Sequence, residues 1–411
     1  MAPVSHDFDE PVDRRGTSSV KHDQDHPDHP GGDLLRLWVA DMDFRAPEAV
    51  TAAIRTRADH GVFGYTEASG RLASSASGWV AAHDGWTPDP STLVTGPGVV
   101  FLIAQAVRAL TAPGDPVLIQ PPVYYPFSQT VRSNGRALVR APLSYDPERA
   151  RAGFVAAVAG EDPGPSPYTF DAAAFEGAVV SSSASMFILC NPHNPVGRVW
   201  TSEELDVMAR VCAEHGVFVV ADEIHADFGR LGHPHAPFAA AAERAGCRYL
   251  VCTSPSKTFN MAGLQLACGW VPDADVRSRI EAEMDACGYF GVNPLSQEAA
   301  VACFEHGAPW LADLKSYLEG TLDWVNRFVA RELPGLCVVQ PEGTYLLWLD
   351  CRGLGLPDDA LARLVEVDAG LWVDPGTMFG PEGSGFIRIN LATQRSVVQD
   401  AFRRLRDAVR A

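Results

Sequence analysis

The stretch SPSKTFNMAG places one lysine among small and hydroxylated residues, directly after the apolar run YLVCT. A lysine at the end of a buried strand is unfavourable unless its ammonium group is paired or its amine takes part in chemistry. Lys257 is therefore either an ordinary surface charge or a nucleophilic amine that can form a Schiff base with an aldehyde cofactor. Ser254 and Ser256, which precede it, could donate hydrogen bonds to a phosphate group.

Two further motifs could hold the phosphate and the ring of such a cofactor. TGPGVV precedes a helical stretch, so the backbone amides of Val99 and Val100 could bind a phosphate at a helix N-terminus. A Gly-Pro turn without any ligand is the structural alternative. In PPVYYPF, either Tyr124 or Tyr125 could stack on an aromatic ring, or the tyrosine could belong to the core or an interface.

Polar residues also follow or interrupt three other apolar runs. Asp222, in ADEIHADF, is either a helix cap or a buried carboxylate that faces a cation, and His225 shares its side if a turn forms. Asn194, in NPHNPVG, lies in a rigid turn that could direct its amide into a cleft or serve the turn alone. Arg388 lies within FIRINLAT, where a forked donor suits a substrate carboxylate.

Each motif alone is ambiguous, but the whole set matches one cofactor. It offers a phosphate cradle, a stacking ring, an acid for a pyridinium, a lysine for an aldehyde and a clamp for a carboxylate. Pyridoxal 5′-phosphate (PLP) acting on an amino acid needs these groups. A dinucleotide-binding enzyme fits less well, because no GxGxxG opens a strand–helix–strand unit.

Short apolar runs alternate with helical stretches between about residues 46 and 290, which predicts a mostly parallel α/β sheet. Ligands of such sheets bind beyond the carboxyl ends of the strands, where the motifs above lie. Thr201 and Glu204 form a capping box, and Gly216 is a helix stop. We therefore expect strands at 116–122, 186–192, 217–224, 249–254 and 266–271, and helices at 99–110 and 202–215.

After about residue 290 the order of elements becomes mixed, which predicts a smaller α+β domain. Its expected elements are a long helix at 309–332, strands at 345–350 and 385–392, a helix near 358–368 and a terminal helix. The segment 151–168 is interpreted as a flexible surface excursion.

The chain is thus expected to have three parts. These are an N-terminal segment packed with the small domain (1–45), a large cofactor-binding domain (46–292), and an interdomain helix with the small domain (293–411).

Composition excludes several classes of partner. The net charge of −18 argues against nucleic acid or an anionic membrane, which would both repel the protein. The nine cysteines form no CxxC motif, which indicates reduced, buried thiols in a cytoplasmic protein. His22, His26 and His29 imitate a metal cluster, but a solvated loop is the favoured interpretation and no metal is predicted.

The chain resembles the fold type I PLP enzymes of the class I/II aminotransferase superfamily, and within them the MalY/PatB-type cystathionine β-lyases (cysteine C–S lyases). Nearly the whole chain carries the resemblance. RRGTSSVK and WVADMDF separate this subgroup from ordinary transaminases. The other motifs that carry it are FGYT, GPGVV, IQPPVYYPF, LCNPHNPVGRVW, ADEIHADF, SPSKTFNMAGLQ and FIRINLAT.

The resemblance implies a large domain with a mostly parallel seven-stranded sheet and assigns a role to each candidate. Lys257 would hold PLP as a Schiff base and move the Cα proton, Asp222 would pair with the pyridine nitrogen, and Tyr124 would stack on the ring. Asn194 and His225 would lie near the ring O3′, Arg388 would bind the substrate carboxylate, and Asn194 would also contact the substrate. The phosphate would be held by Val99, Val100, Ser254 and Ser256.

By the same resemblance, Tyr65 would reach the phosphate and substrate of the neighbouring subunit, so that a homodimer shares its sites. The implied reaction is β-elimination of a thiol from cystathionine or a related L-cysteine S-conjugate, giving pyruvate and ammonia. The alternatives are an aminotransferase, another PLP reaction on a specialised conjugate in secondary metabolism, and a non-catalytic binding protein. Gln265 replaces an arginine that many transaminases have, and His22 replaces the tryptophan usual in the subgroup.

Overall fold

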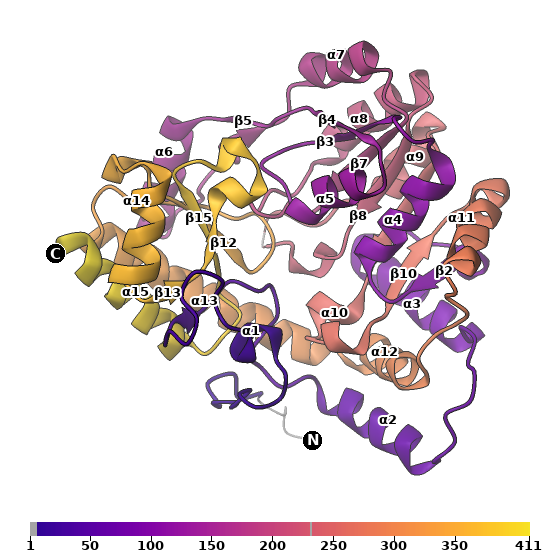
Figure 1. The fold of residues 1–411 in the computed structure, drawn as a ribbon, viewed down its shortest axis with the longest axis horizontal. Helices are drawn as coiled ribbons and strands as arrows, with labels where there is room; N and C mark the ends of the chain where they lie inside the picture. The colour runs from indigo at the N-terminus through magenta and orange to yellow at the C-terminus, as the bar shows by residue number, and fades with distance from the viewer. Residues whose placement is uncertain (1–5, 231) are drawn as a thin grey trace.

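A seven-stranded sheet is the largest element of the computed structural model, which describes residues 6–230 and 232–411 (Figure 1). Strand β10 runs antiparallel to both of its neighbours, and the other adjacent pairs are parallel. This confirms the predicted α/β class with a mostly parallel sheet. The spatial order is β2 (Leu93–Gly96), β10 (Ala267–Trp270), β9 (Tyr249–Thr253), β8 (Phe218–Asp222), β7 (Met186–Cys190), β3 (Pro116–Ile119) and β4 (Ala137–Arg140).

Helices cover both faces of this sheet, which explains why its central strands β7, β8 and β9 are mainly apolar before they reach their carboxyl ends. In β7, Phe187 and Leu189 belong to one core cluster, whereas Met186, Ile188 and Cys190 belong to another. The first face is covered by α3 (Gly70–Asp84), α7 (Ala172–Ser182), α8 (Ser202–Glu214) and α9 (Phe238–Ala245). The second is covered by α4 (Val99–Leu110), α5 (Tyr125–Ser133) and α11 (Ala274–Ala286).

A four-stranded antiparallel sheet organises the C-terminal part, at the left of Figure 1. Its order is β11 (Cys337–Val339), β12 (Leu346–Asp350), β15 (Phe386–Asn390) and β14 (Asp374–Pro375). Its core includes side chains of α6 (Pro147–Ala159), α13 (Ala308–Glu332), α14 (Asp358–Arg363) and α15 (Arg395–Arg410). The long helix α13 extends from α12 (Pro294–His306), which packs on α2 (Glu48–Asp59).

The remaining elements are short. The N-terminal segment contains helix α1 (Val20–Asp23) and strand β1, and the short helix α10 (Pro255–Thr258) follows β9. None of the helices in the described residues combines the length and apolar character that crossing a membrane requires. The two small sheets pair β1 (Leu35–Arg36) with β13 (Leu371–Trp372), and β5 (Ser144–Tyr145) with β6 (Tyr168–Thr169).

The two helices predicted in the large domain lie where expected. α4 spans the predicted range 99–110, and α8 begins after Thr201, whose side chain accepts from the backbone of Glu204 while the Glu204 side chain accepts in return. Gly216 follows α8 with φ of 68°, a left-handed conformation that glycine adopts without strain. All five predicted strands of the large sheet are confirmed.

Two expectations from the sequence are wrong. The segment 151–168 is not a flexible excursion, because α6 spans most of its first half and buries Phe154 in the core of the small sheet. The histidine-rich segment is not a wholly solvated loop, because His26 is 7% exposed. Both errors have the same cause. These segments are rich in polar and small residues, so the sequence does not indicate that Phe154 and His26 pack against residues far away in the chain.

Replacing Phe154 by alanine should destabilise the protein, because its side chain is 3% exposed within the small-sheet core. A buried Phe→Ala change typically lowers the free energy of unfolding by about 3–5 kcal/mol. The matched control is V155A, since Val155 is the next residue of α6 and is 57% exposed. Equal effects of the two substitutions in chemical denaturation would contradict a packed α6.

Candidate active site

One cavity of about 190 Å³ collects nine of the eleven residues predicted for the site. It lies beyond the carboxyl ends of β7, β8 and β9, because parallel strands end at the same edge of a sheet. The predicted residues that line it are Val99, Val100, Tyr124, Asn194, Asp222, His225, Ser254, Ser256 and Lys257. Of the other two, Arg388 contacts Asn194, and Tyr65 lies elsewhere.

Lys257 lies in α10, and its amine faces a backbone carbonyl rather than a carboxylate. Its Nζ donates to the carbonyl oxygen of Ala40 at 2.7 Å, and Tyr345 Oη donates to the same oxygen at 3.0 Å. Burial, assisted by the positive charge of Arg388, lowers the pKa of Lys257 to about 8, against the pull of Asp41 and Asp222. A lysine with this pKa is a usable nucleophile and base.

The chain contains only two other lysines, Lys21 and Lys315. Lys21 Nζ lies 2.7 Å from Asp43 Oδ2 in a fully buried ion pair. Lys315 Nζ donates to the carbonyl oxygens of Asp227 and Gly229, at 2.9 and 2.8 Å. Lys257 is therefore the one lysine of the chain that lines the cavity.

Asp222 ends β8 and is 3% exposed. Its Oδ1 accepts from the backbone amide of Ile224 at 3.1 Å, so it caps the turn and also faces the cavity, which unites the two alternatives from the sequence. Burial raises the pKa of Asp222 to about 7 despite that amide and the charge of Lys257. Such a carboxyl group lacks a full counter-charge, and a pyridinium N–H would supply one.

His225 and Asn194 complete the wall beside Asp222. His225 is 3% exposed, its Nδ1 has no hydrogen-bond partner among the described residues, and burial lowers its pKa well below the usual value, so the ring is neutral. Buried polar atoms are normally paired, and this orphan therefore marks a place for a ligand atom. The buried acid, the orphaned ring nitrogen and the amine together fit PLP.

Another group of residues that line the cavity suits a phosphate. Val99 and Val100 open α4, and the first amides of a helix have no carbonyl partner within it. A side chain added at Gly98 would meet open space, so the helix N-terminus is accessible. Ser254 differs from expectation, because its hydroxyl donates to the carbonyl of Leu266 at 2.5 Å and accepts from Ser256 at 3.1 Å.

Of the two candidate tyrosines, Tyr124 lines the cavity and Tyr125 does not. The Tyr124 amide donates to the carbonyl of Asn194 at 2.9 Å, which joins the turn after β3 to the turn after β7. Tyr125 instead packs edge-on against Phe379, with ring centroids 6.0 Å apart. The geometry thus selects Tyr124 as the stacking candidate.

Arg388 is 3% exposed in β15 and already has a carboxylate partner. It pairs with Asp374, which lies directly opposite on β14, and donates to Asn194 Oδ1 and to the carbonyl of Trp38, both at 2.9 Å. Its Nε has no hydrogen-bond partner within the part of the chain that the structure describes. Asp374, Asn194 and Trp38 therefore hold the Arg388 guanidinium in place, and its Nε–H remains available as a hydrogen-bond donor.

Sequence reasoning missed the contribution of Ala40 and Asp374. Ala40 contributes a backbone oxygen, which no residue type encodes, although WVADMDF was recognised as a subgroup motif. Asp374 was missed because only sheet pairing brings it opposite Arg388.

Tyr65 is fully exposed and does not line the cavity of its own chain. Val62, Phe63 and Phe290 are also more than half exposed. The amide of Val292 donates to the carbonyl of Thr66 at 3.0 Å, so these two segments lie side by side. We refer to Val62, Phe63, Tyr65 and Phe290 as the apolar patch.

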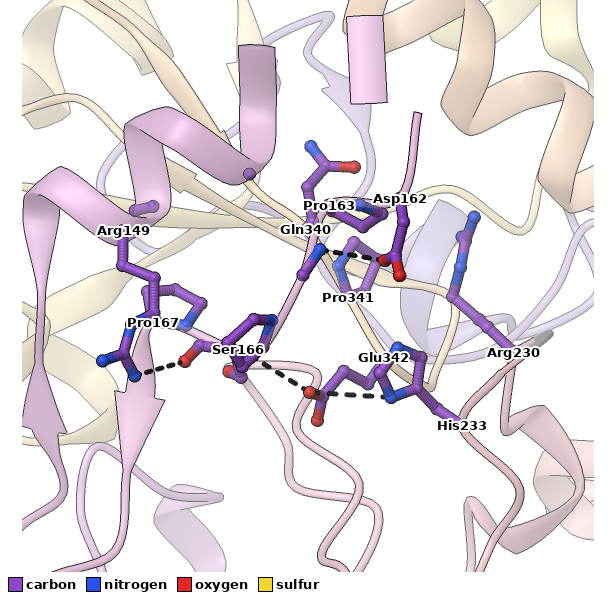
Figure 2. Close-up of a pocket in the computed structure, with 14 residues that line it drawn as sticks. Arg149, Asp162, Pro163, Ser166, Pro167, Arg230, His233, Gln340, Pro341 and Glu342 are labelled. Atoms are coloured by element: carbon purple, nitrogen blue, oxygen red, sulfur yellow. Dashed lines mark hydrogen bonds and ion pairs between the residues drawn. The ribbon is translucent and has the colours of Figure 1, made fainter. Parts of the chain in front are cut away.

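A second cavity, of about 120 Å³, is lined by parts of α6 and the segment that follows it (Figure 2). One of its lining residues is Glu342, which accepts from Arg198 Nη1 and from the amides of Val199 and Ser166. His233 Nδ1 lies 3.7 Å from the same carboxylate. Because its polar groups bind one another and it includes none of the predicted site residues, this cavity is structural.

Comparison with known proteins agrees with the cavity at Lys257. The class I and II aminotransferase family matches residues 33–405. The cystathionine beta-lyase PatB of Bacillus subtilis is 39% identical over 402 residues, which are 98% of this chain and 99% of that protein. Protein MalY of Escherichia coli is 30% identical over 98% of this chain and 99% of its own length.

Solved structures with bound PLP are also similar. Cystalysin from Treponema denticola, which contains pyridoxal 5′-phosphate, superposes with a TM-score of 0.91 at 29% identity, covering 98% of this chain and 99% of that one. The PLP-bound C–S lyase from Staphylococcus hominis gives a TM-score of 0.88 at 29% identity, with 99% and 98% covered.

Proposed function

The chain belongs to the class I and II aminotransferase family, and from this we propose that it is a PLP-dependent C–S β-lyase. Its substrate is cystathionine or a related L-cysteine S-conjugate, and its products are a thiol, pyruvate and ammonia. The cavity at Lys257 carries the proposal, since one amine of lowered pKa lies there beside a buried acid and a helix N-terminus.

We propose that each wall of the cavity binds one part of the cofactor. Lys257 would hold the cofactor at its aldehyde carbon, Asp222 would pair with the ring nitrogen, and Tyr124 would stack on the ring. The orphaned His225 Nδ1 and the amide of Asn194 lie on the side assigned to the ring oxygen. The helix N-terminus at Val99 and Val100, with Ser256, binds the phosphate, and Ser254 supports that turn through its bond to Ser256.

When bound, PLP supplies an electron-withdrawing ring that acidifies the Cα proton of the amino acid and lets a thiolate leave from Cβ. Lys257 removes that proton, since a pKa of about 8 leaves roughly a tenth of its amines neutral at pH 7. General-base catalysis of this kind typically contributes about 10²–10⁴-fold in rate. Asp222 holds the proton at the ring nitrogen, which keeps the ring electron-poor.

Arg388 binds the substrate carboxylate in this proposal. Asp374, Asn194 and the carbonyl of Trp38 hold the guanidinium in one orientation before substrate arrives. The pair also limits the charge of the site, because an unpaired guanidinium buried there would be costly. The donor left at Nε is available to the incoming carboxylate.

We further propose a homodimer with shared sites and a cytoplasmic location. The exposed apolar patch supports a dimer, because apolar side chains gathered on one surface are commonly covered by a partner. Tyr65 then contributes to the partner's cavity, as it lies outside its own. All nine cysteines are free thiols and eight are buried, which suits a reducing compartment.

Purified holoenzyme given L-cystathionine or an S-aryl-L-cysteine should release thiol, pyruvate and ammonia in equal amounts without any added keto acid. K257A should lose about 10²-fold or more in kcat, because the base is removed. The matched control is S256A, which weakens cofactor binding but leaves the base. Amino transfer that needs a keto acid and releases no thiol would support an aminotransferase instead.

Mixed dimers test the shared site. Y65A and K257A should each lower activity, Y65A by about tenfold or more because a charged hydrogen bond is lost. After subunit exchange, one site of each mixed dimer has both native residues, so about a quarter of the wild-type activity should return. If Tyr65 acts within its own chain, the mixture will show no more activity than its two components.

A further inference from the structure

Two histidines of the N-terminal segment meet a glutamate of the C-terminal part, outside the residues that line the cofactor cavity. His26 and His29 follow α1, and Glu366 lies in a short π-helix, Leu364–Asp368. His29 Nε2 lies 3.2 Å from Glu366 Oε2, and His26 Nε2 lies 3.7 Å from Oε1. One ligand atom from each residue lies within 4.8 Å of the other two.

The site is partly enclosed by neighbouring residues, because aromatic side chains pack against His26. His26 is 7% exposed and packs edge-on against Trp372, with ring centroids 4.6 Å apart. Trp372 stacks on Trp38 at 4.5 Å, next to the pairing of β1 with β13. His29 and Glu366 keep partial exposure, so a hydrated ion can reach them.

We propose that His26, His29 and Glu366 bind a divalent transition-metal cation, of which Zn²⁺ fits best. Imidazole nitrogens and a carboxylate oxygen are its usual ligands, at about 2.0–2.2 Å. Tetrahedral geometry with such bonds places ligand atoms roughly 3.3–3.5 Å apart. The separations of 3.2 and 3.7 Å are already close to this, and water completes the coordination.

One contact opposes the ion. The Asp28 amide donates to His26 Nδ1 at 3.2 Å, whereas a metal at Nε2 requires the imidazole proton to move to Nδ1. This weak neutral hydrogen bond would be lost, at a cost of about tenfold in affinity. Coordination by His29, by Glu366 and by the water that completes the site would offset that loss.

The ion would act as a structural tether. His29 and Glu366 are 337 positions apart in the sequence, so the metal would cross-link the N-terminal segment to the C-terminal part. The same segment continues to Ala40, whose carbonyl accepts from Lys257. Metal binding would therefore stabilise the segment that contributes Ala40 to the cavity wall, while the chemistry itself needs no metal at this site.

Untagged holoenzyme with a C287S background, which removes the exposed thiol, is stripped with chelator and dialysed against buffered free Zn²⁺. We expect about one Zn²⁺ per chain, and at least about tenfold weaker binding in H29A and E366Q. H215A is the matched control, because Glu176, Glu214 and His215 form an exposed cluster of similar composition. H215A should leave this affinity unchanged.

Thermal melting separates metal binding from simple misfolding. In chelator, E366Q and the parent should melt at similar temperatures, and Zn²⁺ should raise the melting temperature of the parent and of H215A but not of E366Q. The proposal is overturned if the parent binds no Zn²⁺ at micromolar free metal, or if H29A and E366Q bind it as tightly as the parent does.

Discussion

The proposed chemistry depends on the amine of Lys257, which is buried beside the carboxyl ends of the strands of the large sheet and donates to a backbone carbonyl rather than to a carboxylate. Lys257 donates to the Ala40 carbonyl at 2.7 Å instead of meeting a carboxylate directly. A close ion pair would hold the amine protonated, whereas burial with a neutral acceptor lowers its pKa to about 8. The environment of the proposed nucleophile thus arises because α10 and a distant N-terminal segment meet at Lys257 and Ala40.

The N-terminal segment that contains Ala40 is held in place by an ion-pair cluster around Asp43. Asp43 lies between Lys21 Nζ at 2.7 Å, Arg14 Nη1 at 2.9 Å and His22 Nε2 at 2.9 Å. Burial works against its charge, yet Lys21 and His22 hold the pKa of Asp43 well below its usual range. Removing one partner of such a pair typically costs about 3–5 kcal/mol. His22 therefore belongs to this anchor through its contact with Asp43.

The features that could be predicted from the sequence are those set by residues close together in the chain. The strand end at Asp222, the position of Lys257 shortly after β9 and the cap at Thr201 follow from residue types within a few positions, and all lie where expected. Contacts between distant segments were not predictable in this way. The partner of Arg388 depends on sheet register, the acceptor of Lys257 is a backbone oxygen, and the helical register of α6 was hidden by small residues.

The most direct test reduces the cofactor-free chain with borohydride after brief exposure to PLP at a series of pH values, and then maps the labelled peptide. Only a neutral amine attacks the aldehyde, so a lowered pKa moves labelling to lower pH. The account predicts label on Lys257 with a midpoint near pH 8, well below the 10.5 of an ordinary lysine. Label on Lys21 or Lys315, or a midpoint near 10.5, would contradict it.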